Sequence, residues 1–523
     1  MNKNSALITA LLGIVLGVML AVTVNSIKGK QERIKVSRDG WQKLELILEQ
    51  IDQNYVDNVD YNSVTEAAAA ATLSALDPHS MYLPPVTLEE SETELAGGFD
   101  GIGIQFNVPN DTAIVLEVIG GGPSEKIGLQ PGDRLIKVDD EVIAGVNFPQ
   151  DSMVRRMKGQ AGTKVLITVK RDGEEIPFEI TRGKIPVNSV DAAFMINDTT
   201  GYIKLEKFTR TTTQEFVNAS RNLLEKGMTY LIFDLRDNTG GYFDQALNLS
   251  NLFLEKDSKI VYMEGLHRER EDYSADGRGF LKDIRLTVLI DEGTASSSEI
   301  FSGAIQDNDR GTIVGRRSFG KGLVQEPIYF SDGSGIRLTV ARFYTPSGRC
   351  IQKPYSDDYQ YDIVRRYETG ELTDADSIKV NKEEEYFTVG GRSVYGGGGI
   401  VPDVFVPLDT TKATMFYSNC SKKATPMRFA SYFFDGHKRE LGAIDNYDAL
   451  LSYLNRSNLD KAFLDFAATR DGLVPAEGEW EATAYYMMPQ VRALVSRYSK
   501  LGDDAFYHLY LDIDDMVAVA IAL

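Results

Sequence analysis

Residues 291–325 read DEGTASSSEIFSGAIQDNDRGTIVGRRSFGKGLVQ, and this stretch decides how the centre of the chain folds. Its small residues at 294–298 open a segment with apolar residues at helical spacing, and short strands are expected at 312–314 and 323–329. Further strands and helices alternate upstream, at 201–205, 213–226, 230–235, 244–253 and 285–290. Such alternation predicts a largely parallel α/β sheet, with its sites beyond the carboxyl ends of the strands.

Two residues of this stretch have the chemistry of a nucleophile and a base. Ser296 stands where a helix is expected to begin, and the backbone N–H groups of a helix N-terminus favour developing negative charge. Lys321 follows 25 positions later, between two glycines. A lysine amine that burial keeps neutral can take the proton of a serine hydroxyl. The more ordinary interpretation of Ser296 is a helix N-cap.

Two further groups complete this constellation. Gln325 lies four residues after Lys321 on the same side of an extended segment, so its amide could orient the amine without adding charge. The turn that contains Gly240 and Gly241 follows a buried strand, and its backbone N–H groups could face an oxyanion. A strand-to-helix turn that needs positive φ would show the same glycines.

A competing motif overlaps the lysine. Residues 315–321 read GRRSFGK, which fits G-x-x-x-x-G-K, the start of a phosphate-binding loop. That motif continues with Ser or Thr and a helix, whereas here Gly322 and an expected strand follow. The sequence therefore disfavours nucleotide binding.

Composition limits the class of protein. A chain of 523 residues is too long for one core, and its 43% of hydrophobic residues describes a globular protein. The net charge of −20 argues against nucleic acid as the main partner. The two cysteines, Cys350 and Cys420, have no metal-ligand spacing and are expected to be free thiols.

The N-terminus contains a candidate membrane anchor. Residues 6–24 carry no charge and are long enough to span a bilayer as a helix, and no clear cleavage site follows, so we interpret 1–28 as a signal anchor. The basic residues after it favour the opposite orientation under the positive-inside rule, so the expectation of export rests on a family resemblance. A helical region, 36–96, comes next. Its turn contains His79, which we interpret as a capping or packing residue.

Residues 97–184 change to short alternating strands and glycine turns. Their order, with G-I-G-I at 101–104 before the first strand and G-L-Q-P-G-D at 128–133 before the third, resembles a PDZ domain. In that family an extended peptide adds as a strand, and its terminal carboxylate binds the glycine loop. The resemblance implies a carboxylate loop made of Gly101, Ile102, Gly103 and Ile104.

The motifs of the following region resemble those of the C-terminal processing peptidases, also called tail-specific proteases. They are D-L-R-x-N-x-G-G at 234–241, T-A-S-S-S-E-I at 294–300 and F-G-K-G-x-V-Q at 319–325. The resemblance implies a crotonase- or Clp-protease-like α/β core with an inserted PDZ domain. The family's roles fall on Ser296 as nucleophile, Lys321 as base, Gln325 as the residue that orients the lysine, Asp307 as the aspartate near the dyad, and Gly240 or Gly241 with Ser297 as oxyanion donors.

The sequence departs from the family at several places. An arginine near the end of the PDZ helix often links peptide binding to activation in the family, and Lys158 takes that place here. Residues 353–393 are polar and predict an exposed insertion within the protease core, 185–408. The helical extension at 409–523 is expected to serve packing or homo-oligomer contact.

The sequence thus predicts a single-pass serine endopeptidase of the bacterial inner membrane, with its catalytic part in the periplasm. Its PDZ domain would capture the C-termini of protein or peptide substrates and pass the tail to Ser296. We expect no metal, organic cofactor or nucleic acid. Intact Ser296, Lys321 and Gln325 disfavour one alternative, a PDZ scaffold protein with an inactive core. The PDZ domain and the serine–lysine pair disfavour the other, a crotonase-type acyl-CoA enzyme.

Overall fold

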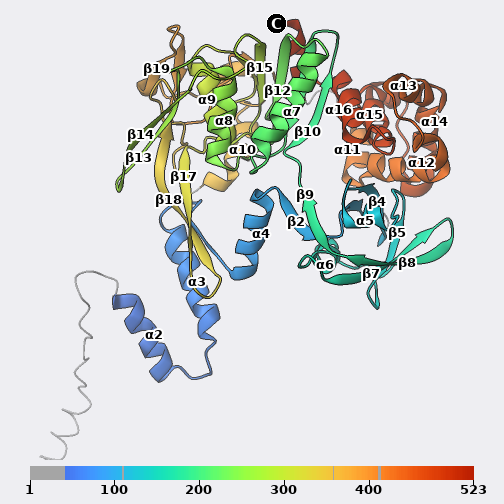
Figure 1. The fold of residues 1–523 in the computed structure, drawn as a ribbon, viewed down its shortest axis with the longest axis horizontal. Helices are drawn as coiled ribbons and strands as arrows, with labels where there is room; N and C mark the ends of the chain where they lie inside the picture. The colour runs from blue at the N-terminus through green and yellow to red at the C-terminus, as the bar shows by residue number, and fades with distance from the viewer. Residues whose placement is uncertain (1–41, 109–110, 357, 410–413) are drawn as a thin grey trace, which may run out of the picture. The chain divides into compact units, whose positions relative to one another are not determined.

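A computed structural model describes residues 42–108, 111–356, 358–409 and 414–523 (Figure 1). These residues belong to two compact units that divide between Ala69 and Ala70. The first unit contains α2 (Gln42–Asn54) and the first part of α3 (Tyr61–Ser74). All the remaining helices and strands belong to the second unit.

The second unit is built around a six-stranded sheet in the order β10-β11-β12-β15-β16-β21. Strand β10 runs antiparallel to β11, and the other neighbours are parallel. The strands are β10 (Val190–Met195), β11 (Thr200–Leu205), β12 (Tyr230–Asp234), β15 (Arg285–Ile290), β16 (Thr312–Gly315) and β21 (Val404–Phe405). The predicted α/β fold with a largely parallel sheet is confirmed.

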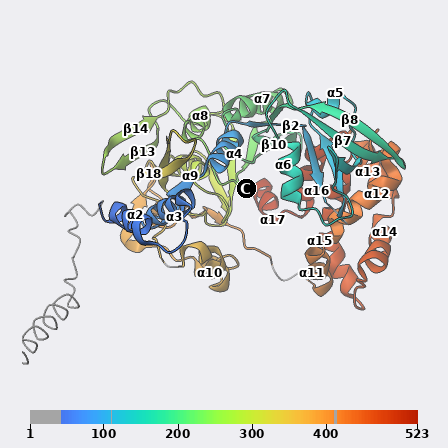
Figure 2. The same ribbon diagram turned by 90° about the horizontal axis from the view of Figure 1, so that it is seen from below.

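Both faces of this sheet are covered, which explains why β12 is the fully buried run Tyr-Leu-Ile-Phe-Asp. One face packs against three helices, α7 (Thr212–Glu225), α8 (Phe243–Phe253) and α9 (Ser297–Asp307) (Figure 1). The last helix, α17 (Asp515–Ala522), covers part of the other face (Figure 2). There the hydroxyl of Tyr230 donates a hydrogen bond to the carbonyl oxygen of Ala520 (2.5 Å).

A second sheet, of antiparallel strands, contains the segment that follows Lys321. Its order is β1-β18-β13-β14, with β17 also paired to β18. The strands are β1 (Met81–Leu83), β13 (Lys259–Gly265), β14 (Arg268–Ser274), β17 (Leu323–Tyr329) and β18 (Gly335–Tyr344). Because Met81 pairs with Arg337, the turn before β1 lies beside β17 and β18. Helix α4 (Pro85–Leu95) follows β1.

The region that resembles a PDZ domain folds as a separate antiparallel sheet in the order β3-β4-β5-β7-β8, with β6 paired to β5. Its elements are β3 (Ile104–Asn107), β4 (Ala113–Val118), α5 (Pro123–Lys126), β5 (Arg134–Val138), β6 (Glu141–Val142), α6 (Gln150–Met157), β7 (Lys164–Arg171) and β8 (Glu174–Thr181). Strand β3 is an edge strand that pairs with β4 alone among the described strands. Strands β2 (Gly98–Gly101) and β9 (Gly183–Pro186) pair with each other where the chain enters and leaves this region.

The C-terminal extension is helical, as predicted, and has a hydrophobic core of its own that includes Phe429, Phe463 and Met487. Its elements are α11 (Met415–Lys422), α12 (Thr425–Leu441), α13 (Tyr447–Arg456), α14 (Leu459–Phe466) with a π-helical turn η5 (Ala467–Asp471), α15 (Glu479–Ser496), α16 (Gly502–Tyr510) and the 3-10 turn η6 (Leu511–Ile513). Both cysteines are free thiols, and burial raises the pKa of each, that of Cys420 to about 11.

Residues 353–393 are largely exposed, as their polarity predicted, but they form regular structure and bury several charged side chains. They fold as η2 (Tyr359–Tyr361), α10 (Asp362–Glu368), η3 (Ala375–Ser377), η4 (Lys382–Glu384) and β19 (Glu385–Phe387), which pairs with β20 (Ser393–Tyr395). Arg366 is only 2% exposed, because it forms an ion pair with Glu371 (2.7 Å) and donates to the carbonyl oxygen of Ser318 (3.2 Å). Charged side chains of the insertion are therefore buried as pairs against the loop that leads to Lys321.

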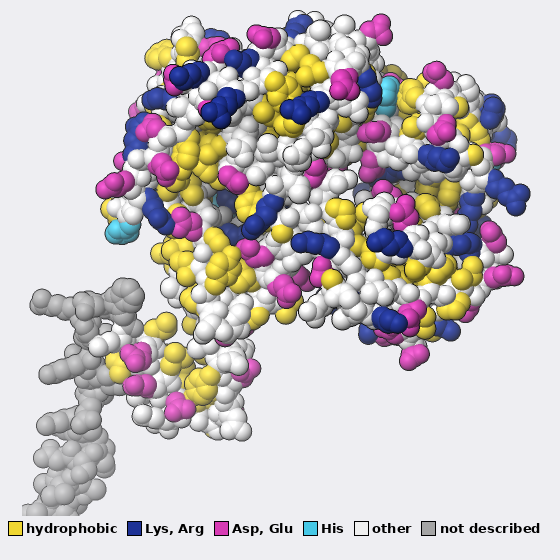
Figure 3. Space-filling view, in the orientation of Figure 1, with side chains coloured by type: hydrophobic (Ala, Val, Ile, Leu, Met, Phe, Trp, Pro, Cys, Tyr) yellow, Lys and Arg dark blue, Asp and Glu magenta, His cyan; other side chains and the backbone are white. Residues whose placement is uncertain are grey.

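Acidic and basic side chains are interspersed over the face of the molecule drawn in Figure 3.

In the part of the chain that the structure describes, no helix combines the length and apolar character needed to cross a bilayer. The predicted anchor, 1–28, lies outside the described residues. Within those residues, no three His, Cys, Asp or Glu are grouped as the ligands of a metal ion would be.

Candidate active site

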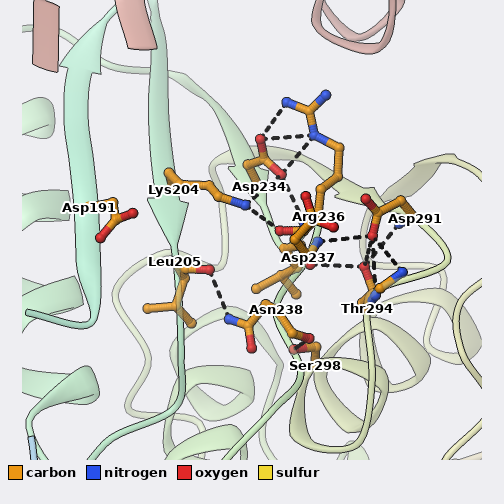
Figure 4. A network of polar contacts seen from close by, with 12 residues as sticks. Asp191, Lys204, Leu205, Asp234, Arg236, Asp237, Asn238, Asp291, Thr294 and Ser298 are labelled. Carbon is orange, nitrogen blue, oxygen red and sulfur yellow. Dashed lines mark hydrogen bonds and ion pairs between the residues drawn. The ribbon is translucent and has the colours of Figure 1, made fainter. Parts of the chain in front are cut away.

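Ser296 lies in the turn between β15 and α9, where it is the N-cap of the helix. Its φ of +57° is rare for a residue with a side chain. Thr294 fixes the turn by donating through Oγ1 to the carbonyl oxygen of Leu235 (2.9 Å), and Asp291 Oδ1 accepts a hydrogen bond from the N–H of Asp237 (2.9 Å) (Figure 4). A strained residue that its surroundings hold in place is typical of a functional position.

The glycine turn after β12 lies directly against Ser296. Gly240 has a φ of +95°, and a Cβ built on it would be 2.8 Å from Ser296 Cβ and 2.8 Å from the backbone nitrogen of Ser297. Asn238 connects the two turns, because its carbonyl oxygen accepts a hydrogen bond from Ser298 Oγ (3.0 Å) (Figure 4). Glycine is thus required at 240 by both the backbone conformation and the close contact with the serine turn.

The three predicted oxyanion donors differ in availability. The N–H of Gly240 already donates to Asn238 Oδ1 (2.9 Å). Within the described chain, no hydrogen bond occupies the backbone N–H of Gly241 or that of Ser297. Ser297 Oγ holds these two residues together by donating to the carbonyl oxygen of Gly241 (2.9 Å). Gly241 and Ser297 are therefore the donors that an oxyanion could use.

A network of charged side chains holds the end of β12, from which the glycine turn starts (Figure 4). Arg236 donates to Asp234 (Nε to Oδ1, 3.0 Å) and forms an ion pair with Asp514, the N-cap of α17 (2.7 Å). Lys204 donates to the carbonyl oxygen of Arg236. Burial disfavours the ionised form of Asp234, but Arg236 and Lys204 hold the pKa of this carboxyl well below its usual value. The C-terminal helix is in this way connected to the motif that carries the glycines.

Lys321 and Ser296 line one cavity. Its volume is about 700 Å³. Its lining includes six of the seven residues predicted for catalysis and oxyanion binding, all except Asp307: Ser296, Ser297, Gly240, Gly241, Lys321 and Gln325. Lys321 Nζ donates a hydrogen bond to Gln325 Oε1 (2.9 Å). Burial lowers the pKa of the amine, and the positive charge of Arg337 lowers it further. Both effects favour the neutral amine, which is the form a general base needs.

Within the described residues, no direct hydrogen bond joins Ser296 Oγ to Lys321 Nζ. Both side chains open into the cavity that would receive a substrate. Hydrogen bonds between a nucleophile and its base often tighten only when substrate is bound. In the described structure the two side chains therefore share a cavity without a direct hydrogen bond between them.

Glu299 joins the two segments, a role that the sequence analysis missed. Its buried carboxylate accepts hydrogen bonds from the N–H groups of Ser296 (2.9 Å), Lys321 (2.8 Å) and Gly320 (2.8 Å) and from Ser318 Oγ (2.5 Å). The four hydrogen bonds favour the ionised carboxylate and lower the pKa of Glu299. Burial has the larger effect and raises this pKa above its usual value. The available signal was the Ser-x-x-Glu spacing at 296–299, which is that of a capping box.

Asp307 does not lie near the serine and the lysine. It is the last residue of α9, about 16 Å along the helix axis from Ser296. Its carboxylate forms a fully buried ion pair with Arg349 (2.7 Å) and accepts a hydrogen bond from the N–H of Ser347 (3.1 Å). Helix α9 is 11 residues long, and the residue predicted as the aspartate near the dyad therefore stabilises the end of the helix that lies away from Ser296.

The predicted peptide-binding residues lie together in the PDZ-like sheet. Gly101 ends β2, Ile102 and Gly103 form the connection, and Ile104 begins the edge strand β3. Lys158 is the C-cap of α6, and a Cβ on Gly101 would be 3.8 Å from the Lys158 Cα. The Lys158 amine lies 5.1 Å from the centroid of the Phe99 ring. The positive charge is thus placed beside the glycine loop.

Comparisons with known proteins agree with this arrangement. The family model described as Peptidase family S41 matches residues 199–364, and the PDZ domain model matches residues 101–181. The chain is 32% identical over 354 residues to a probable CtpA-like serine protease of Staphylococcus haemolyticus. This alignment covers 67% of this chain and 71% of that protein. It is 29% identical over 385 residues to a probable CtpA-like serine protease of Staphylococcus aureus, covering 73% and 76%.

Two solved structures are also similar. A photosystem II D1 C-terminal processing protease is 26% identical, with 71% of this chain and 88% of that chain covered and a TM-score of 0.38. The PDZ domain of a carboxy-terminal protease from Vibrio cholerae, in complex with peptide, is 30% identical, with 17% and 99% covered and a TM-score of 0.16. By its identity to relatives over most of their length, the chain belongs to peptidase family S41 and is a serine protease with a PDZ domain.

Proposed function

We propose that this protease cleaves polypeptides near their C-termini, with Ser296 as the nucleophile and Lys321 as the general base. The proposal rests on the shared cavity of about 700 Å³. In it, a serine at a helix N-terminus, a buried lysine amine and two unoccupied backbone N–H groups surround one space. These are the components of acyl transfer through a serine.

The proposed reaction begins with Lys321 neutral. Its Nζ takes the proton of Ser296 Oγ while Oγ bonds to the carbonyl carbon of the substrate. The carbonyl oxygen gains the negative charge and accepts hydrogen bonds from the N–H groups of Gly241 and Ser297, and one such donor contributes about 10²- to 10³-fold in rate. Lys321 then gives its proton to the leaving amine, and a water that the same lysine deprotonates releases the acyl-enzyme.

The PDZ sheet supports capture of the substrate's C-terminus. Because β3 is an edge strand, its outer side can accept an extended peptide as an added strand. The terminal carboxylate of that peptide would bind N–H groups of the loop 101–104. The positively charged amine of Lys158, whose backbone lies beside Gly101, would stabilise the negative charge of this carboxylate.

We also propose that residues 1–28 anchor the protease in the bacterial inner membrane and that its catalytic part is exported to the periplasm. The support is the uncharged stretch at 6–24. Protease added to cells with a permeabilised outer membrane should then degrade the catalytic part while cytoplasmic markers survive. Protection of the catalytic part until the inner membrane is lysed would contradict export.

Cleavage of an unfolded protein substrate tests the proposed reaction. Ser296→Ala and Lys321→Ala should each abolish cleavage, and undiminished cleavage by either contradicts the dyad. Amidation of the substrate's C-terminus should raise KM about tenfold or more, because loss of a charged hydrogen bond costs about 1.5–3 kcal/mol. Equal KM values for the free acid and the amide would contradict capture of the carboxylate, even with the dyad intact.

A further inference from the structure

A chain of hydrogen bonds leads from the lysine amine into a turn far upstream in the sequence. Lys321 Nζ donates to Gln325 Oε1 (2.9 Å), and Gln325 Nε2 in turn donates to the carbonyl oxygen of His79 (2.7 Å). The orientation of the glutamine amide, and with it the position of the lysine amine, therefore depends on where the backbone of His79 is held.

The side chain of His79 is itself held by the insertion. His79 Nε2 lies 2.7 Å from the hydroxyl oxygen of Tyr359, and the two rings pack edge to face with centroids 5.3 Å apart. Tyr359 is 6% exposed. The Tyr359 oxygen also accepts a hydrogen bond from Gln352 Nε2 (3.2 Å), and Gln352 Oε1 accepts one from the N–H of Gly322 (3.0 Å). Since Gly322 follows Lys321, the hydrogen bonds form a closed ring around the lysine.

Each part of this ring is anchored. Asp77 holds the His79 turn, because its Oδ1 accepts hydrogen bonds from the N–H groups of His79 (2.8 Å) and Ser80 (2.7 Å). On the other side, the Lys353 amine lies 4.4 Å from the centroid of the Tyr359 ring and 3.1 Å from Asp362 Oδ2 in helix α10. The insertion therefore supplies a rigid support for the tyrosine hydroxyl.

The hydrogen-bond pattern assigns the proton positions. The Tyr359 oxygen receives the amide hydrogen of Gln352, so its own hydrogen is free to be donated to His79 Nε2. That bond requires a neutral imidazole. Burial is the largest effect that lowers the pKa of His79 to about 4, and the positive charge of Lys353 acts in the same direction, so the ring is neutral near pH 7. A neutral ring also adds no positive charge beside the lysine.

We propose that Tyr359 and His79 are positioning residues for proteolysis, which act through Gln325 to hold the Lys321 amine toward Ser296. This inference rests on the proposed serine–lysine mechanism. It gives the insertion, 353–393, a part in catalysis: the insertion completes the support of the base. Neither residue touches the reacting atoms, so the effect of changing either must pass through the lysine.

The substitution Tyr359→Phe tests the inference, because it removes the hydroxyl and keeps the ring that packs on His79. We expect kcat to fall about tenfold, which is the effect of losing the buried hydrogen bond between the Tyr359 hydroxyl and the His79 imidazole. KM should change little. The acid limb of the pH–rate profile should move to higher pH, because a less confined amine is better hydrated. The other charged groups that act on the lysine, Arg337, Glu299 and Asp77, stay in place.

A double-mutant cycle separates this role from a general loss of packing. Tyr359→Phe should add little to the loss caused by Gln325→Ala, because both changes break the same chain of contacts. The matched control is Tyr361→Phe, the same change at a side chain that is 66% exposed, which should leave kcat and the pH profile unchanged. Thermal unfolding of each variant shows whether the fold is retained.

Three outcomes overturn the inference: wild-type kcat and pH profile in Tyr359→Phe, equal losses in Tyr359→Phe and Tyr361→Phe, or fully additive losses in the Tyr359→Phe, Gln325→Ala double mutant. If Tyr359→Phe does not fold, His79→Gln tests the same chain of contacts and carries the same expectations. Failure of the proposed mechanism is recognised separately, by activity that survives in Lys321→Ala.

Discussion

The carboxylate of Glu299 accepts a hydrogen bond from the backbone N–H of Lys321 at 2.8 Å, while its Oε2 also accepts one from the backbone N–H of Ser296 at 2.9 Å. Residues that are 25 positions apart in the sequence are thus attached to one buried side chain. The distance between the serine and lysine segments is consequently set by a fully buried group that does not line the cavity.

Replacing Glu299 by glutamine should lower activity strongly. An amide has one acceptor oxygen, so its NH₂ group would face backbone donors that now bind a carboxylate oxygen. A buried donor without an acceptor costs about 1–3 kcal/mol, so we expect a loss of kcat/KM of about 10- to 100-fold and a lower midpoint of thermal unfolding. Glu326→Gln, at a half-exposed carboxylate that pairs with Arg268 on the surface, is the control. Equal behaviour of the two variants would show that Glu299 does not position the dyad.

Gly240→Ala should inactivate the enzyme. The added methyl group would lie 2.8 Å from Ser296 Cβ and from the nitrogen of Ser297, so the serine turn and one oxyanion donor must move. Displacement of such a donor lowers kcat by about 10²- to 10³-fold. Gly173→Ala is a matched control, because its φ of +94° is nearly the same as +95° at Gly240 and a Cβ there meets no atom within 4 Å. Comparable kcat values in the two variants would contradict the close contact.

Arg337→Gln should change the pH dependence of activity. In the proposed mechanism the rate rises with pH as Lys321 loses its proton. Burial and the charge of Arg337 both lower the pKa of this amine. Removing the charge therefore raises that pKa, moves the acid limb to higher pH and lowers activity severalfold at pH 7. Arg342→Gln, on the same strand, is the control. If Arg337→Gln has the same pH profile of kcat/KM as the wild type, the charge of Arg337 does not act on Lys321.

Periodicity and motif order were sufficient for the central sheet. The run at 230–234 is apolar because both faces of β12 are covered, and this pattern is visible in the sequence. Strand β14 was missed because its residues, Arg-Glu-Arg-Glu-Asp-Tyr-Ser, are mostly exposed and carry no apolar alternation. The burial of Arg366 was missed for a related reason: its partner Glu371 becomes apparent only when the chain is folded.

The candidate site divides in the same way. Ser296, Lys321 and Gln325 stand in short motifs, so their approach could be expected from the sequence. The contact between His79 and Tyr359 joins residues 280 positions apart, and no local sequence pattern predicts it. The role of Asp307 was transferred from the family resemblance. It was wrong because Asp307 pairs with Arg349, a residue outside the motifs that carry the resemblance.

Covalent labelling with a serine-reactive fluorophosphonate tests the central claim most directly. The rate and position of the adduct would be followed by intact-mass and peptide mass spectrometry in the wild type and in Lys321→Met. We predict one adduct, on Ser296, that forms faster as pH rises and much more slowly in Lys321→Met. An adduct on another residue, or labelling of Ser296 at the same rate in Lys321→Met, would contradict a serine nucleophile activated by this lysine.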